Sequence, residues 1–241
     1  MWKYVIMASA LVLSAMVIAA AYTSGSRNLG TITVTGLGET EFTSDLIVIE
    51  GTVAAEDYDA AEAYHALEQS REKMVSFLES KGVKAENISF NMPYTYKKTR
   101  SVYEDGEYRG EQFEGYSISQ SFTIESKDVD TTESAARELP SLIAEGINIS
   151  VRNPMYYYTG LEDVKLSLLS AAAADARDRA MNIAQSSQSE LGELKLSRAG
   201  VFQITAATGD EEFSAGGSFN LSSREKKARV TVRSEFYIKE K

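Results

Sequence analysis

The stretch YSISQSFTI, which runs from Tyr116 to Ile124, alternates strictly between two kinds of residue. Serine or threonine occupies every second position, and aromatic, aliphatic or glutamine residues occupy the others. Since successive side chains of a β-strand point to opposite faces, this stretch predicts a strand with one apolar face and one hydroxyl-lined face. Strands that alternate so cleanly belong to sheets with a single covered face, which are usually antiparallel.

Six further segments are predicted to be strands of the same kind of sheet. They are Thr31–Thr35, Leu46–Ala55, Ile88–Tyr96, Ile147–Val151, Leu194–Ala206 and Ala228–Ile238. Gly36-Leu37-Gly38 is expected to break the first of them as a hairpin or bulge turn. Pro93 interrupts the third and favours an edge position or a bulge, because proline cannot donate to a strand ladder.

Three segments with a helical spacing of apolar residues alternate with these strands, at residues 59–81, 128–144 and 159–188. Asp59 with Glu62, and Thr159 with Glu162, have the spacing of capping boxes. The third helix is rich in alanine and can approach another backbone closely, most simply that of its own sheet. The predicted fold class is therefore α+β: an antiparallel sheet or sheets with three helices packed on one side.

The first 25 residues are predicted to be a targeting segment, and residues 26–241 a single α+β domain. Tyr4–Tyr22 contains no charged residue and follows Lys3. As a helix, this run would span about 28 Å, close to the thickness of a bilayer core. A cleaved signal peptide is the alternative, since Ala19 and Ala21 offer an A-x-A cleavage pattern. Either interpretation exports the rest of the chain.

The composition argues against most catalytic chemistry. The chain has no cysteine and one histidine, His65, which excludes thiol nucleophiles, thiolate metal sites and histidine triads within one subunit. The net charge of −10 argues against a general nucleic-acid binder. There is no Walker motif, nucleophile elbow or metal-ligand cluster, and Gly36-Leu37-Gly38 lacks the third glycine of a dinucleotide loop. We therefore expect no enzymatic activity, no cofactor, and no catalytic or metal-binding residue.

The charged clusters that remain have ordinary structural explanations. Acidic pairs stand at each predicted helix start, where carboxylates cap free N–H groups: Asp57/Asp59, Asp128/Asp130 and Glu162/Asp163. The segment from Arg224 to Lys241 holds seven basic residues against three glutamates, and we expect it to pair with its own neighbours. The loop from Gly216 to Ser223 is expected to be a flexible entry to that strand rather than an anion cradle.

The most suggestive feature is a hairpin predicted to project over residues 97–115, with its turn at Asp105-Gly106. Six aromatic residues on and beside it are interleaved with charges: Tyr94, Tyr96, Tyr103, Tyr108, Phe113 and Tyr116. Aromatic residues are enriched at protein interfaces, so these six are candidates for oligomer contacts. Equally, they could pack on one another across the hairpin. Tyr156-Tyr157-Tyr158 forms a second cluster, either a strand end with rings on both faces or part of the same contact.

Several segments follow one another in a recognisable order: Thr35-Gly36-Leu37-Gly38-Glu39, a strand opened by Asp45, a helix holding Ala60, Ala61 and Ala63, FLESKGVKAENIS (Phe77–Ser89), and SLLSAAAADARDRAMNIAQ (Ser167–Gln185) followed by Leu191-Gly192. This order resembles the SIMPL-domain family of bacterial periplasmic and envelope proteins. The resemblance covers about Gly30 to the C-terminus. It implies a sheet with helices on one side, a long hairpin, ring- or channel-shaped homo-oligomers in some members, and a link to envelope and oxidative stress.

Three hypotheses follow for the function. The first is a non-enzymatic homo-oligomer of the cell envelope that assembles through the hairpin and sheet edges. Its domain would lie on the periplasmic side, anchored in the inner membrane through residues 4–22 or released by cleavage. The second is a periplasmic binding module that recognises a protein or peptide through an exposed strand edge. The third, least supported by the residues, is a hydrolase that uses the acidic pairs.

Overall fold

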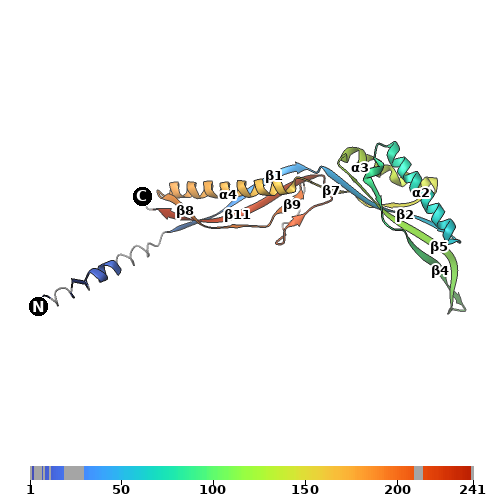
Figure 1. The fold of residues 1–241 in the computed structure, drawn as a ribbon, viewed down its shortest axis with the longest axis horizontal. Helices are drawn as coiled ribbons and strands as arrows, with labels where there is room; N and C mark the ends of the chain where they lie inside the picture. The colour runs from blue at the N-terminus through green and yellow to red at the C-terminus, as the bar shows by residue number, and fades with distance from the viewer. Residues whose placement is uncertain are drawn as a thin grey trace. The chain divides into compact units, whose positions relative to one another are not determined.

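The structure is a computed structural model, and the described residues form two compact units (Figure 1). It describes residues 30–208 and 214–239, together with Trp2, Met7, Ser9, Ala10 and residues 12–18. The first unit comprises Met1–Gly38, Leu168–Gly200 and Val230–Lys241, and the second comprises Glu39–Ser167 and Val201–Arg229. The sequence predicts one α+β domain over residues 26–241, and within this range the contacts distinguish two compact units.

The predicted targeting segment lies largely outside the described residues. Residues 12–18 within it are helical. Among the residues that the structure describes, no helix combines the length and the apolar character needed to cross a bilayer. The anchor or signal over residues 4–22 therefore stays a prediction.

The second unit contains an antiparallel sheet in the order β3-β5-β2-β6, with β4 also pairing β5 and β7 also pairing β2. Its strands are β2 (Leu46–Asp57), β3 (Ile88–Phe90), β4 (Tyr94–Glu104), β5 (Glu107–Ser126), β6 (Asn148–Val151) and β7 (Met155–Tyr157). The alternating stretch Tyr116–Ile124 lies within β5. Its apolar residues Ile118, Phe122 and Ile124 are buried, and Ser121 on the other face is exposed.

Helices cover one face of this sheet. They are α2 (Ala60–Ser80), α3 (Val129–Glu138) and the 3₁₀ helix η2 (Leu139–Glu145), with a short 3₁₀ helix η1 (Ala85–Asn87) before β3. Leu67 and Met74 of α2 and Leu139 of η2 belong to the same buried cluster as Phe122. The Asp59 carboxylate caps α2 by accepting from the N–H groups of Ala61 and Glu62. The reciprocal half of the predicted capping box is absent, because Asp59 N–H donates to Asp57 instead of Glu62.

Pro93 divides the predicted strand 88–96 into two strands. β3 ends at Phe90 and β4 begins at Tyr94, and both pair with β5 along the same edge. Asn91 still donates to the Ser121 carbonyl, so the ladder loses its regular pairing only around the proline.

The first unit is built on parts of four elements. They are residues 31–38 of β1 (Thr31–Thr43), residues 230–239 of β11 (Glu225–Lys239), residues 190–199 of β8 (Glu190–Ala199) and residues 168–186 of α4 (Leu161–Ser186). β11 pairs antiparallel with β8 from Val232 to Lys239. One stripe of α4 faces this sheet: Ala172, Ala176, Ala180 and Ala184, each at most 1% exposed. The predicted partner of the alanine-rich helix, its own sheet, is therefore confirmed.

Gly36 and Gly38 do not break the first strand as predicted, since β1 continues through them to Thr43. A Cβ on Gly36 would lie 2.1 Å from the Ala172 carbonyl oxygen, and one on Gly38 would lie 2.3 Å from that of Leu168. The close approach of α4 therefore requires glycine at both positions. Glycine inside a strand marks either a bulge or bend, or a site where another backbone approaches closely, and here it marks the second.

Two further predictions need correction. The three helices do not share one sheet face, because the buried stripe of α4 packs on β1 and β11 while α2 and α3 pack on the β2–β5 sheet. The predicted strand 194–206 is two strands, β8 and β9 (Gln203–Ala206), with Gly200 between them. β9 pairs with β11 in the second unit and, in parallel, with β10 (Ser218–Phe219), so not every pairing is antiparallel.

A tyrosine-rich hairpin as the candidate functional site

The predicted hairpin is present as β4 and β5, joined by a two-residue turn at Asp105-Gly106 (Figure 1). Both turn residues have positive φ, 55° for Asp105 and 81° for Gly106, as a type I′ turn requires. The paired strands extend beyond the predicted residues 97–115, because β4 begins at Tyr94 and β5 continues to Ser126.

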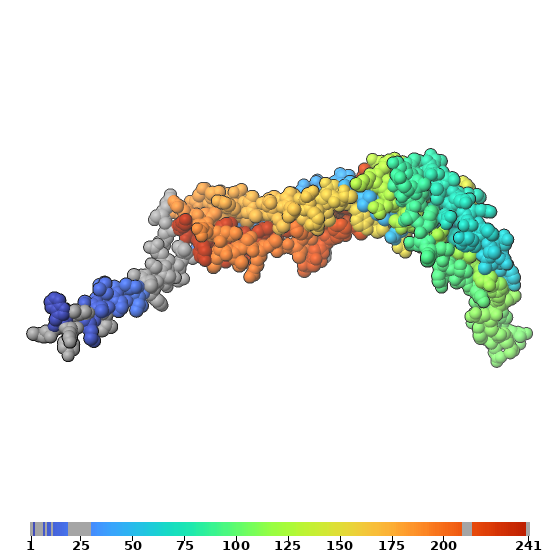
Figure 2. Space-filling view, in the orientation of Figure 1, coloured from blue at the N-terminus to red at the C-terminus, as the bar shows by residue number. Residues whose placement is uncertain are grey.

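The distal part of this hairpin is a two-stranded ribbon with unpaired edges. β2 accompanies β5 only as far as the Asp57–Tyr116 pair. From Glu107 to Gly115, β5 therefore pairs with β4 alone, and within the described residues the other edge of β4 pairs with nothing. We call the segments 97–104 and 107–115 the ribbon. In Figure 2, its light-green atoms are not covered by any other segment on the visible face.

Two bulges shape the ribbon. The pairing register shifts between Lys98 and Thr99 and again between Val102 and Tyr103. Gly115 and Gly110, beside the extra residues, have φ values of 124° and 121°. A bulge of this kind increases the local twist, and only glycine adopts such φ values without strain.

The register places the six candidate aromatic residues on two faces. Tyr94 and Tyr96 lie opposite Ser119 and Ser117, on the face of the sheet that turns away from α2. Their rings stack with centroids 6.4 Å apart. The other four share the helix side: Tyr103 contacts Tyr108 at 5.8 Å, and Phe113 contacts Tyr116 at 5.2 Å.

These contacts leave most of the ring area exposed. Tyr94 is 68% exposed, Tyr103 65%, Tyr108 56% and Tyr96 45%, while Phe113 and Tyr116 are half-buried. The rings therefore pair with one another, which is one of the two alternatives from the sequence, and they still present exposed area. Their role as oligomer contacts stays a prediction.

Sequence reasoning missed one member of this surface. Tyr58, which joins β2 to α2, places its ring 5.1 Å from Phe113 and is 71% exposed. Met92, between β3 and β4, is also highly exposed. An aromatic residue directly before the helix cap Asp59 was the available signal for Tyr58.

Charges on the ribbon are segregated by strand. The β4 segment carries Lys97, Lys98 and Arg100 against Glu104, and the β5 segment carries Glu107, Glu111 and Glu114 against Arg109. Arg100 and Glu114 form an ion pair across the strands at 2.9 Å. Lys98 pairs with Glu56 of β2, and this hydrogen bond raises the pKa of Lys98 above its usual value despite partial desolvation.

The Tyr156-Tyr157-Tyr158 cluster is not part of the hairpin surface. Tyr156 is buried in the core of the second unit, and this burial, together with the nearby Glu133, raises the pKa of its phenol. Tyr158 packs against Phe42 with ring centroids 4.8 Å apart. The rings therefore divide between the two sides of a strand end, which was the first of the two predicted alternatives.

The remaining candidate residues, a histidine and the acidic residues at helix starts, lie on the surface or stabilise the fold. His65 is exposed on α2 and lies 3.9 Å from Glu68. Asp128 caps α3, and Asp130 forms an ion pair with Arg224 at 2.5 Å. Within the described residues, no group of three or more histidine or carboxylate side chains could hold a metal ion.

The third predicted helix start also differs from expectation. Thr159 does not cap α4, since its N–H and hydroxyl donate to the two carboxylate oxygens of Asp45 at 2.7 and 2.6 Å. Burial alone would raise the pKa of Asp45, but these hydrogen bonds lower it overall. Asp45 therefore ties the start of β2 to the segment before α4.

The basic last strand pairs with its neighbours in the second unit, as expected. Lys227 and Arg229 of β11 pair with Glu41 and Glu39 of β1, each at 2.9 Å. Lys226 is buried, and its ammonium donates to the carbonyls of Asn220 and Ser223, both at 2.6 Å. Backbone carbonyls of the loop before β11 thus bind the ammonium group of Lys226.

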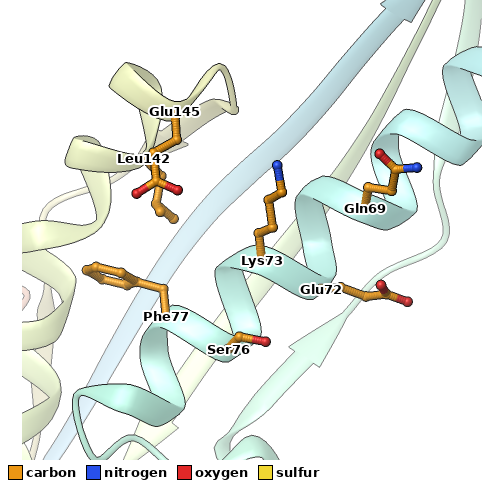
Figure 3. A pocket seen from close by; sticks show the side chains of 7 residues that line it. All are labelled: Gln69, Glu72, Lys73, Ser76, Phe77, Leu142 and Glu145. Atoms are coloured by element: carbon orange, nitrogen blue, oxygen red, sulfur yellow. The ribbon is translucent and has the colours of Figure 1, made fainter.

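An open groove lies between α2 and η2 in the second unit (Figure 3). Lys73 and Phe77 point from α2 toward the side of Leu142, whereas Glu72 and Ser76 project from the other side of the helix. The groove encloses about 590 Å³, but the charged groups around it do not converge on one point.

Comparisons with known proteins place the chain by family. No curated protein matches it. Among solved structures, the de novo designed protein Foldit4 is 11% identical, with 44% of this chain and 93% of that chain covered and a TM-score of 0.24. A crystal structure of a "putative amidohydrolase/peptidase" from Burkholderia cenocepacia is 16% identical, with 52% and 29% covered and a TM-score of 0.19. Such low scores carry no argument about fold or activity. The family model described as SIMPL, protein of unknown function (DUF541), matches residues 32–236, and the chain therefore belongs to the SIMPL family.

Proposed function

We propose that this protein is a non-enzymatic, self-assembling component of the bacterial cell envelope, and that the ribbon joins one copy to the next. The observation that carries the proposal is the combination of two unpaired strand edges with opposite charge. The edge of β4 is basic and that of β5 acidic, so β4 of one copy complements β5 of another.

Backbone pairing supplies the attraction in this arrangement. An unpaired edge offers a row of N–H and C=O groups that a second strand can satisfy, which soluble proteins usually prevent. The exposed rings of Tyr103 and Tyr108 on one side, and Tyr94 and Tyr96 on the other, would be buried as apolar area beside the new strand pair. Because β4 meets β5 rather than itself, the contact is heterologous and repeats to a ring or a filament.

The proposed location depends on what happens to the predicted targeting segment. If residues 4–22 remain attached, the protein is held in the inner membrane with both units on the periplasmic side. If they are removed, it is periplasmic. Intact mass of the protein from the native membrane fraction distinguishes the two, because cleavage removes about two kilodaltons or more.

The stress role implied by the family resemblance belongs to the same proposal. A strain that lacks the protein is expected to be more sensitive to peroxide than its parent, and the chain without the ribbon is expected not to restore resistance. Restoration by a chain that cannot assemble would separate the stress role from assembly.

The test of assembly uses charge reversal and mixing. Lys97→Glu lowers the net charge of the β4 segment from +2 to 0, and Glu111→Lys brings that of the β5 segment from −2 to 0, so each variant alone is expected to give smaller species by light scattering. An equimolar mixture is expected to give larger species than either variant alone, because the unaltered β4 of the Glu111→Lys copy then meets the unaltered β5 of the Lys97→Glu copy. Lys73→Glu on α2 is the matched control and is expected to leave the size unchanged.

Deletion of Lys97–Glu114 provides an independent arm, and should yield monomers that retain the circular dichroism of the folded units. If wild type and deletion are both monomeric, assembly through the ribbon is excluded. A monomer that retains a co-purifying peptide or protein would support the alternative function, a binding module that offers the same strand edge to a different partner.

A further inference from the structure

The sheet of the first unit has one face covered by α4 and an open face on its other side. Along β11, buried Val232, Ser234 and Phe236 alternate with residues of the open face. The open-face residues of β11 are Thr231, Arg233, Glu235 and Tyr237. Arg233 and Glu235 balance each other on β11, but Arg198 and Lys195 of β8 add two positive charges beside them, although the chain as a whole carries a net charge of −10.

Two arginines lie directly opposite each other on this face. Arg198 of β8 and Arg233 of β11 are partners in the antiparallel register. Like charges directly opposite one another destabilise a sheet. Among the described residues, neither guanidinium forms an ion pair, in contrast to Arg229 on the same strand, which pairs with Glu39. The repulsion between the two arginines is therefore not relieved by a carboxylate in direct contact.

The nearest carboxylate is already engaged. Glu235 accepts a hydrogen bond from the Lys195 ammonium at 2.9 Å. The hydrogen bonds from Lys195 and from the Thr31 hydroxyl, with a smaller contribution from Arg233, lower the pKa of Glu235, so it is ionised at neutral pH. Its charge is offset by Lys195, which leaves the two arginines with excess positive charge.

A hollow of about 400 Å³ adjoins the two arginines, and it is lined by Arg198, Arg233, Glu235, Leu196 and Thr33. We propose that Arg198 and Arg233, with the Thr33 hydroxyl, form a binding site for a phosphate-bearing anion. The planar fork of each guanidinium matches two phosphate oxygens, and the third oxygen can accept from the hydroxyl.

Phosphate fits this site better than a carboxylate does. A carboxylate has two oxygens, which one guanidinium fork already satisfies, and a single charge that offsets one arginine. A phosphate monoester carries close to two negative charges and three acceptor oxygens, enough to bridge both forks. Binding would also remove the unfavourable opposition of Arg198 and Arg233, which the free protein bears.

The test is a calorimetric titration of the full-length protein with inorganic pyrophosphate at constant ionic strength. Saturable binding is expected, and the double variant Arg198→Gln/Arg233→Gln is expected to weaken it at least about tenfold. Arg177→Gln removes a single positive charge from an exposed position on α4 in the same unit, and should change the affinity less than about twofold. Arg198→Lys/Arg233→Lys keeps the charge without the fork and should fall between wild type and the glutamine variant.

Thermal unfolding shows whether the variants remain folded. The glutamine variant is expected to unfold at the same temperature as wild type or higher without ligand, because the repulsion is gone. Pyrophosphate should then raise the unfolding temperature of wild type but not of the variant. Absence of saturable binding to wild type, or equal binding by wild type and the glutamine variant, overturns the proposal.

A second arm identifies the source of the phosphate. Full-length protein is incubated with vesicles of phosphatidylcholine alone or with added phosphatidylglycerol, and bound protein is measured by flotation. Arginine-dependent extra binding to the phosphatidylglycerol vesicles assigns the site to a lipid headgroup, whereas pyrophosphate binding without it assigns a soluble phosphate ester. The readout does not involve the ribbon, so it stands whether or not the protein assembles.

Discussion

The two units of this protein solve the same packing problem, a helix on a sheet, with opposite kinds of residue. In the first unit, α4 presents alanines to glycines of β1, and the backbones nearly touch. In the second, α2 presents leucine and methionine to isoleucine and phenylalanine of β2 and β5. The first interface has little apolar side chain to lose and no room for more, while the second is filled by large side chains. Substitutions that add side-chain atoms should therefore destabilise the α4–β1 interface of the first unit most. Substitutions that remove them should destabilise the interface of α2 with its sheet in the second unit most.

The largest effect is expected from Gly36→Leu in the first unit. Its Cβ would meet the Ala172 carbonyl oxygen at 2.1 Å and the Ala176 nitrogen at 2.4 Å, and these are backbone atoms that cannot rotate away. We expect destabilisation of about 4–5 kcal/mol or more, in the range that marks exceptional substitutions. Hydrogen exchange of the α4 amides measures it. Leu37→Ala, at an exposed neighbouring position, is the control and should leave exchange nearly unchanged.

The second unit should respond most to a deletion. Phe122→Ala removes the largest fully buried side chain and is expected to cost about 3–5 kcal/mol of unfolding free energy in denaturant titrations. Gly51 is a tight glycine of this unit, and its Cβ would lie 2.3 Å from the Phe122 ring. The cost of Gly51→Ala should therefore shrink in the Phe122→Ala background. Additive costs would show that the ring is not what Gly51 accommodates.

These contrasts explain which parts of the fold could be predicted from the sequence. The alternation in β5, the Asp59 cap and the Asp105-Gly106 turn depend on neighbouring residues, and all three are present. Gly36 and Gly38 were interpreted as a break because their true partners, Ala172 and Leu168, are more than a hundred residues away in the sequence. The division into two units was missed for the same reason, since the first unit combines three distant segments of the chain.

The candidate site was predictable in composition but not in arrangement. The six aromatic residues and the turn were visible in the sequence. Phe113 lies on the same face as Tyr108 and Tyr116 only because of the bulges beside Gly110 and Gly115, which alter the alternation in β5 without a strong local signal. Arg198 and Arg233 become neighbours only through the register of β8 and β11, so no sequence pattern indicated them.

A smaller effect is expected at the start of α2. Asp59→Ala removes the acceptor for two N–H groups and should cost about 1 kcal/mol. Glu62→Ala tests the predicted capping box and should cost clearly less, because Asp59 N–H donates to Asp57. Both values are obtained from denaturant midpoints at equal slope. An equal cost for the two variants would indicate that the Glu62 side chain does contribute the reciprocal half of the capping box.

The smallest effect is expected on the pH dependence of stability, through the α4–β1 interface of the first unit. Asp175 of α4 accepts from Leu37 N–H of β1 at 2.8 Å, a helix-to-strand hydrogen bond that the short distance between backbones permits. The hydrogen bond from Arg179, and next that from Leu37, lower the pKa of Asp175 below its ordinary value of 3.8. A carboxylate whose pKa is lowered by folding stabilises the protein above the unfolded pKa, and this contribution is lost as the pH falls through the folded pKa. Wild type should therefore lose more stability between pH 5 and about pH 3 than Asp175→Asn, whose side chain does not titrate. Asp178→Asn, at an exposed position on the same helix, should follow wild type in the same thermal unfolding series. Parallel curves for wild type and Asp175→Asn would mean that the ionised form of Asp175 adds nothing to the glycine–alanine contact.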